Sequence, residues 1–309
     1  MKSTLGKVVL ITTAVAVVSL GIAVILFFTT NMNGTWEMKG GIIVDEGETI
    51  ALEGINKIDI RTGSIDVAVS KHQGSGAEVQ LRGTVYHHRP EALPVLTVEQ
   101  TGDSLEITTE QKKGGHFFHG FHSGDLVLEI RVPEQYRHLL AVHTGSGDVD
   151  IVDQDLAELS VDTGSGDICL RSVRAAAVSL ESSSGDQEAD ELQAEYVELT
   201  SASGDLRAGG LQGGARVRSA SGEITLSYLE FDADLEARSG SGDVRLFLTG
   251  TAQFRLDARS SSGDISCEFP LTLTGPDSEM SRKTLIGTVG DGARRVAVKT
   301  SSGDIQIRY

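Results

Sequence analysis

Aromatic residues, cysteine and basic residues are all scarce in this chain of 309 residues, and each scarcity excludes something. Aromatic side chains make up only 5% of the residues, which suits a thin core of Val, Ile, Leu and Ala. The two cysteines, Cys169 and Cys267, lie several repeats apart, so no intramolecular disulfide is expected. Lys and Arg number 27 against 44 Asp and Glu, and the net charge of −17 argues against nucleic acid and anionic lipid surfaces as partners.

Signatures of catalysis are also missing from the sequence. It contains no nucleophile-elbow, phosphate-loop or zinc motif, and no His recurs at a fixed offset from a Ser and a carboxylate. The best enzyme hypothesis is a polysaccharide-cleaving β-helix, a class that usually carries long loops and clustered acids on one face. Because the loops here are short and the outward positions are mixed, we expect no catalytic residues and no enzyme.

A Ser-Gly-Asp motif returns throughout the second half of the chain. Successive copies are 18 to 21 residues apart, except for a final step of 40, which is about two steps. Self-similarity at such a period indicates a repeat architecture. The structural Gly of each turn is Gly147, Gly166, Gly185, Gly204, Gly222, Gly242, Gly263 and Gly303.

Aligning the copies on this Gly shows a fixed pattern of side-chain types. Ser always precedes the Gly, Ser or Thr stands three residues before it, and mostly apolar residues stand two and four after it. Such alternation is the period of a half-buried strand. Gly suits a tight turn because it tolerates backbone angles that a Cβ forbids, and Ser and Thr suit it because their hydroxyls can satisfy backbone groups at a corner. We therefore predict an all-β, parallel β-solenoid with about 20 residues and two main strands per coil. An antiparallel sandwich is the alternative, but it gives no reason to place Ser at one offset in every copy.

The N-terminal segment predicts a membrane anchor. Residues 8–28 carry no charge and would span about 31 Å as a helix. We favour an uncleaved transmembrane signal anchor over a cleaved signal peptide, because the residues after Phe28 form a poor cleavage site. No Cys follows the segment, so a lipoprotein anchor is excluded. Lys2 and Lys7 predict a cytoplasmic stub at residues 1–7 and place the bulk of the chain outside the cytoplasmic membrane.

The rest of the chain divides by composition. Residues 29–49 predict a Gly-containing linker, residues 50–139 irregular N-terminal coils, and residues 140–309 regular repeats, so that 50–309 form one solenoid domain. Residues 58–69 are a degenerate first copy, with Ile65 in place of the Gly. An atypical rung at 284–289 would explain the 40-residue step. The last strand, 305–309, is expected at an open end, where it would permit self-association.

These motifs resemble a known family. The Ser-Gly-Asp turns, the strand Leu128-Glu129-Ile130-Arg131-Val132-Pro133 ahead of them and the closing segment from Gly287 to Ile305 are similar to the bacterial "putative adhesin" family of β-strand-repeat domains of unknown function. The resemblance covers about residues 50–309. It implies a solenoid-like domain that is commonly anchored to the cell envelope, and it implies no catalytic residues. The acids that directly follow the Gly of each copy form what we call the acidic column. Two residues depart from the pattern: Gln187, which stands where other copies have an apolar residue, and Glu223, which replaces Asp in the acidic column.

The acidic column is the sharpest candidate for a binding site. Stacked acids one rung apart would repel each other by about 1 kcal/mol at the dielectric of water, so something must offset the repulsion. We favour hydrogen bonds from each acid to backbone N–H groups of its own turn. The weaker alternative is a Ca²⁺ strip, Ca²⁺ being the only cofactor considered. Its candidate ligands are Asp148, Asp167, Asp186, Asp205, Asp243 and Asp264, and Glu223 and Asp304 complete the column.

A second candidate is the run His116, His119 and His122 with interspersed Phe. Three-residue spacing would present metal ligands on a helix, but the flanking glycines favour a loop with incidental His. An apolar contact loop for a partner is the other alternative.

The sequence thus predicts a non-catalytic, membrane-anchored module of the cell envelope that binds envelope proteins or glycans and no nucleic acid. The alternative function is an accessory component of an envelope-stress sensing system. A glycan-active enzyme ranks last.

Overall fold

The computed structural model describes residues 42–85, 93–111, 125–273 and 279–309, and all regular structure in these ranges is β-strand. No helix within them is long and apolar enough to cross a membrane. The predicted anchor at 8–28 lies outside the described residues. The strands are β1 Ile42–Ala51, β2 Lys57–Thr62, β3 Asp66–His72, β4 Gly76–Val85, β5 Pro94–Thr101, β6 Ser104–Gln111, β7 Val127–Pro133, β8 Leu139–Thr144, β9 Val149–Thr163, β10 Ile168–Ser182, β11 Gln187–Ser201, β12 Leu206–Ser219, β13 Ile224–Tyr228, β14 Leu235–Ser239, β15 Val244–Phe247, β16 Phe254–Ser260, β17 Ile265–Cys267, β18 Glu279–Met280, β19 Thr284–Val289, β20 Arg294–Thr300 and β21 Ile305–Arg308.

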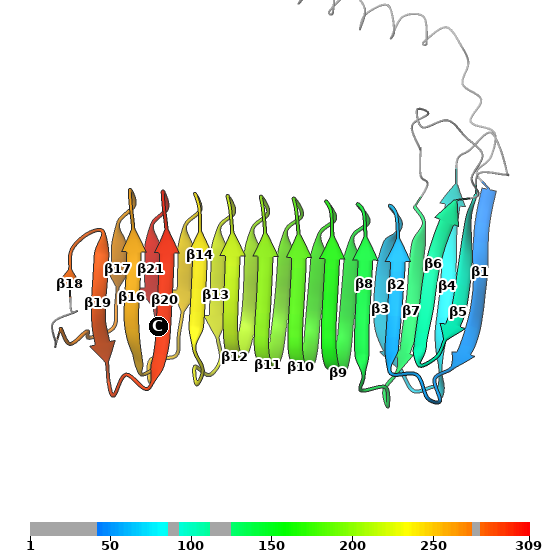
Figure 1. Cartoon of the computed structure of the whole chain (residues 1–309), viewed down its shortest axis with the longest axis horizontal. Helices are drawn as coiled ribbons and strands as arrows, with labels where there is room; N and C mark the ends of the chain where they lie inside the picture. Colours follow the sequence, from blue (N-terminus) through cyan, green and yellow to red (C-terminus); the bar gives the residue numbers. More distant parts are fainter. Residues whose placement is uncertain (1–41, 86–92, 112–124, 274–278) are drawn as a thin grey trace, which may run out of the picture. The chain divides into compact units, whose positions relative to one another are not determined.

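The repeats stack as parallel coils, as Figure 1 shows for β9 to β12. Residue 168 pairs with residues 149 and 187, so each coil lies in register one repeat from the next. Each coil runs along one face, turns a corner, and returns along a second face to the next Ser-Gly-Asp turn. We call them face A (β3, β7, the first halves of β9–β12, β13, β15, β21, β17) and face B (β6, β2, β8, the second halves of β9–β12, β14, β20, β16). The predicted all-β, mostly parallel architecture is confirmed.

The core lies between the two faces. Inward side chains of face A, such as Val149 and Ile151, and of face B, such as Leu159 and Val161, are almost fully buried in one continuous cluster. A single repeat could not bury its apolar side alone, so stacking provides the core. In the C-terminal coils the core becomes aromatic, through successive edge-to-face contacts with ring centroids 5.1 to 6.0 Å apart. Those rings belong to Tyr228, Phe231, Phe254 and Phe269.

The corner opposite the Ser-Gly-Asp turns depends on a left-handed residue in each of four successive coils. Asp153, Ser172, Glu191 and Gly210 all have φ between 54° and 65°. Three of them are not Gly, so each of these corners carries a conformational cost that stacking offsets.

The N-terminal end is closed by antiparallel strands. β4 pairs antiparallel with both β1 and β7, while β5 and β6 form a hairpin. β2 and β3 form a unit stacked on the regular repeats, as the degenerate copy predicted. β1 begins at Ile42, ahead of the predicted start of the solenoid near Ile50.

The C-terminal coils do not stack in sequence order, which corrects two predictions. β20 pairs with β14 and β16, and β21 pairs with β15 and β17, so the last unit lies between its two predecessors (Figure 1). The predicted atypical rung at 284–289 is instead β19, which caps β16 antiparallel. The prediction of an exposed last strand was wrong, because β21 is paired on both sides. Repeat spacing cannot reveal this order, since every unit presents the same kind of turn to its neighbours.

Candidate functional site

The eight Ser-Gly-Asp turns lie one above another along one edge of the stack. At Gly185, an added Cβ would lie 1.9 Å from the carbonyl oxygen of Gly166 in the neighbouring turn. The other seven turn glycines show the same clash, with distances of 1.9 to 2.2 Å. None of the eight has a positive φ. Gly is therefore needed for close approach between turns, and not for the unusual backbone angles that the sequence suggested.

The hydroxyl three residues before each Gly holds the turn together from inside. The side chain of Ser182 is buried, and its Oγ accepts a hydrogen bond from the N–H of Gly185 at 2.8 Å. The same bond recurs in all eight turns at 2.7 to 3.1 Å. By contrast, the Ser directly before each Gly is exposed, so the edge displays a row of hydroxyl groups.

The acidic column forms hydrogen bonds between turns. Oδ1 of Asp167 accepts the backbone N–H of Asp186 in the next turn at 2.8 Å, and Oδ1 of Asp186 accepts that of Asp205. The expectation that each acid bonds within its own turn was wrong. These bonds offset the repulsion between stacked carboxylates. Seven such bonds of 2.8 to 2.9 Å link Asp66, Asp148, Asp167, Asp186, Asp205 and Glu223 in one run, and Asp243, Asp304 and Asp264 in another.

A lysine closes the second run. Among the described residues, no further repeat lies beyond Asp264 to supply an N–H group. The Nζ of Lys283 instead bonds to the carbonyl oxygens of Ser262 and Gly263 and lies 3.9 Å from the Asp264 carboxylate. The charge of Lys283 therefore compensates the last acid of the column.

The described part of the chain contains no preformed cluster of metal-ligating side chains. Nowhere in those ranges do three His, Cys, Asp or Glu side chains gather as a metal site would require. The His116, His119 and His122 run lies outside the described residues. Calcium along the acidic column stays a prediction.

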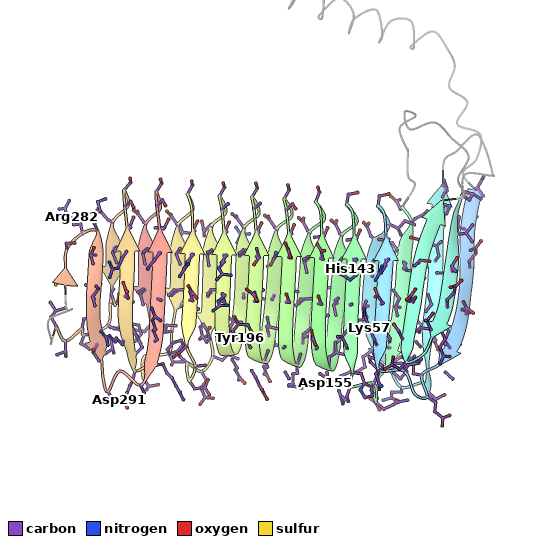
Figure 2. The ribbon with its side chains drawn as sticks, in the orientation of Figure 1. Lys57, His143, Asp155, Tyr196, Arg282 and Asp291 are labelled. Carbon is purple, nitrogen blue, oxygen red and sulfur yellow. The ribbon has the colours of Figure 1, made fainter. Side chains whose placement is uncertain are left out.

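Sequence reasoning missed a charged cluster at the N-terminal end of face B. Asp59 is only 2% exposed and lies 2.7 Å from Lys57 Nζ and 2.9 Å from Arg61 Nη2. His143 lies 3.9 Å from Asp59 and 3.8 Å from Asp162, and Figure 2 shows Lys57 and His143 on this face. Burial alone would raise the pKa of Asp59, but hydrogen bonds from Arg61 and Lys57 lower it to about 2. Asp59 is therefore ionised at neutral pH and holds two cations on the sheet.

An open groove of about 550 Å³ lies beside the left-handed corners, where the second halves of β9 to β12 begin. Its lining includes Leu156 and, in the next two coils, the smaller Ala175 and Ala194, together with charged groups such as Asp155 and Arg174. Asp155 lies there, 2.7 Å from Arg137, whose hydrogen bond lowers the pKa of Asp155 (Figure 2). A carboxylate with a lowered pKa does not suit the general acid of a glycosidase, which needs a raised one.

Both cysteines are free. Burial raises the pKa of each thiol, which makes the thiolate less available as a nucleophile or metal ligand.

Comparison with known proteins now adds to this geometry. A family model described as Toastrack DUF4097 matches residues 55–308. No curated protein matches the chain. A crystal structure of a "putative adhesin" from Bacteroides fragilis is 15% identical, with a TM-score of 0.51, over 86% of this chain and 96% of that one.

Two further crystal structures are more distant. A "putative adhesin" from Parabacteroides distasonis is 10% identical over 86% of this chain and 98% of its own, with a TM-score of 0.46. A "putative lipid binding protein" from the same organism is 16% identical over 85% and 96%, with a TM-score of 0.42. At these identities the likeness concerns the fold.

Proposed function

Because the chain belongs to the Toastrack DUF4097 family, we propose that it is a non-catalytic interaction module of the cell envelope, held by a transmembrane helix at residues 8–28. The observation that carries the proposal is the register of the coils. It sets outward side chains of neighbouring strands in straight rows about 4.8 Å apart, which is a surface suited to an extended or repetitive partner.

The features around the groove favour binding over catalysis. Arg137 and Arg174 both face Asp155, at 2.7 and 3.7 Å, so the charges there are already paired. The Bacteroides fragilis protein, described as a "putative adhesin", supports the same class of function. An accessory role in envelope-stress sensing is the second candidate, and it would use the same surfaces to bind a protein or peptide.

Localisation is tested with reporters fused after Tyr309, whose side chain is 69% exposed. Alkaline phosphatase, which folds only outside the cytoplasm, should be active, and β-galactosidase should not. An active β-galactosidase fusion together with an inactive phosphatase fusion would contradict the proposed topology.

Binding is tested by capture with immobilised residues 34–309 from a solubilised envelope fraction. We expect enrichment of one glycan or protein that soluble residues 34–309 displace. The heat-unfolded chain is the control, and equal capture by both forms would refute a folded interaction module. A captured signalling protein would favour the stress-sensing function.

A further inference from the structure

The charge of this chain is distributed unevenly. Residues 207–309 contain thirteen Lys and Arg and thirteen Asp and Glu, so the whole net charge of −17 falls on residues 1–206. Charge asymmetry of this kind points to a surface with its own partner. A solvated exterior explains the acidic charge of residues 1–206. The higher share of basic residues in the C-terminal coils needs a separate explanation.

Basic side chains gather on face B of those coils. Arg218 on β12 lies beside Arg238 on β14. Lys299 on β20 lies next to Arg238, and Arg259 on β16 lies on the other side of Lys299. These four residues, which we call the cation row, occupy one position on four adjacent strands (Figure 1). Below them the same strands carry further charged side chains of both signs, namely Arg216, Arg255, Arg294, Arg295, Glu236 and Asp257, and Asp234 lies just ahead of β14.

The side chains of the cation row are exposed to solvent, and the repulsion between their like charges lowers the stability of the sheet. The side chains of Arg218, Arg238 and Arg259 are 43%, 52% and 52% exposed, and that of Lys299 is also exposed. Like charges on directly neighbouring strands destabilise a sheet. A purely structural face would alternate its charges, as it does where Arg216 pairs with Glu236 at 3.2 Å.

Ion pairs within the sheet offset only part of this cost. Arg218 lies 3.4 Å from Glu198, Arg259 lies 2.7 Å from Asp257, and Arg238 contacts Glu236. Lys299 makes no ion pair with any residue of the described ranges, and arginines flank it on both sides.

We propose that the cation row binds an acidic polysaccharide of the uronic-acid type, laid across the strands; this rests on the proposed interaction function and names its partner class. The cations repeat at the strand spacing of about 4.8 Å, close to the length of one sugar residue in an extended polysaccharide. Guanidinium groups match carboxylates in a two-pronged geometry. One chain can therefore meet the row with successive carboxylates.

The surroundings favour this occupant over a second copy of the chain. A second copy would bring its own net charge of −17 against another. At the position of the row, Thr200 separates Arg218 from Glu181, so the next acid in line lies two strands away, about one Debye length, and the nearer Glu198 is already paired with Arg218.

The test measures binding of fluorescently labelled oligogalacturonate to the full chain in neutral detergent by anisotropy. We expect binding that weakens at least tenfold when NaCl rises from about 50 to about 500 mM. The double variant Arg238→Gln with Lys299→Gln should weaken it at least tenfold. The matched control is Arg171→Gln, an arginine on face A that is 50% exposed and paired with Asp150, and it should change binding less than twofold.

Several results would overturn the proposal. They are no binding by the wild-type chain, equal binding of a neutral oligosaccharide of the same length, or equal loss in Arg171→Gln and the double variant. Binding of polyphosphate or phosphatidylserine vesicles in preference to oligogalacturonate would assign the row to another polyanion. Salt-sensitive self-association that the double variant abolishes would assign it to a second copy. The proposed function fails separately, if residues 34–309 capture no envelope component.

Discussion

The turn glycines offer a direct test of how the coils stack. In Gly185→Ala, the new methyl group would lie 1.9 Å from the carbonyl oxygen of Gly166 and 2.5 Å from its carbonyl carbon. Backbone atoms cannot rotate away as a side chain would. The two turns must therefore separate by more than about 1 Å to reach an ordinary van der Waals contact.

That separation would lengthen the hydrogen bonds that join the two turns. The N–H of Asp186 bonds to Oδ1 of Asp167 at 2.8 Å, and the N–H of Ile168 bonds to the carbonyl oxygen of Asp186 at 2.9 Å. Each contributes about 1 kcal/mol, and misfit of the packed turns adds to the loss. We expect Gly185→Ala to lower the free energy of unfolding by about 2–4 kcal/mol.

The assay is urea unfolding of the full chain, followed by circular dichroism. The control is Gly63→Ala, in the equivalent turn of the first unit, because nothing lies within 4 Å of a Cβ added there. It should change the free energy of unfolding by less than about 1 kcal/mol. A cost for Gly185→Ala no larger than that of Gly63→Ala would refute close approach as the reason for Gly.

Substitutions at three other positions probe the remaining polar features. Asp186→Asn keeps an acceptor oxygen and should leave the thermal midpoint nearly unchanged, whereas Asp186→Ala should cost about 1–2 kcal/mol in urea unfolding; equal costs would show that the bond between turns is unimportant. Gln187 is 1% exposed with Oε1 unpaired, so Gln187→Leu should stabilise the chain by about 1 kcal/mol, measured by the same unfolding curve; a loss of stability would contradict this. Asp59 has a lowered pKa, so its contribution to the free energy of unfolding is present above pH 4 and disappears as the pH falls toward 2. The difference in melting temperature between wild type and Asp59→Asn should therefore shrink over that range. A constant difference would contradict the role assigned to Asp59.

The repeat columns predicted the coil but not every reason for it. Ser182 and its equivalents were expected to satisfy backbone groups at the turn, and they do so. The role of Gly185 was misjudged, because close approach between turns depends on a neighbour that lies 19 residues away. The bond from Asp186 to Asp167 was misplaced for the same reason: a local pattern cannot distinguish a bond within a turn from one between turns.

Long-range order was the larger omission. No sequence signal distinguishes the unit ending at Ser302 from those at Ser241 and Ser262, so nothing showed that it inserts between them. The cation row was hidden as a consequence, since Lys299 joins Arg238 to Arg259 only through that insertion. Lys57 and Arg61 lie only two residues from Asp59, but the burial of Asp59 depends on β6 and β8, which pair with β2 from far along the chain, and the sequence pattern does not show those pairings.

The order of the turns can be measured by disulfide cross-linking, with Cys169 and Cys267 replaced by Ser. Ser241→Cys with Ser302→Cys places the thiols on adjacent turns, about 4.8 Å apart at Cα and within disulfide range. Ser241→Cys with Ser262→Cys places them two turns apart, about 10 Å at Cα and out of range. The structure predicts that mild oxidation bridges the first pair and leaves the second pair reduced. Bridging of the second pair but not the first would show that the coils follow sequence order, and would contradict both the inserted last unit and the cation row.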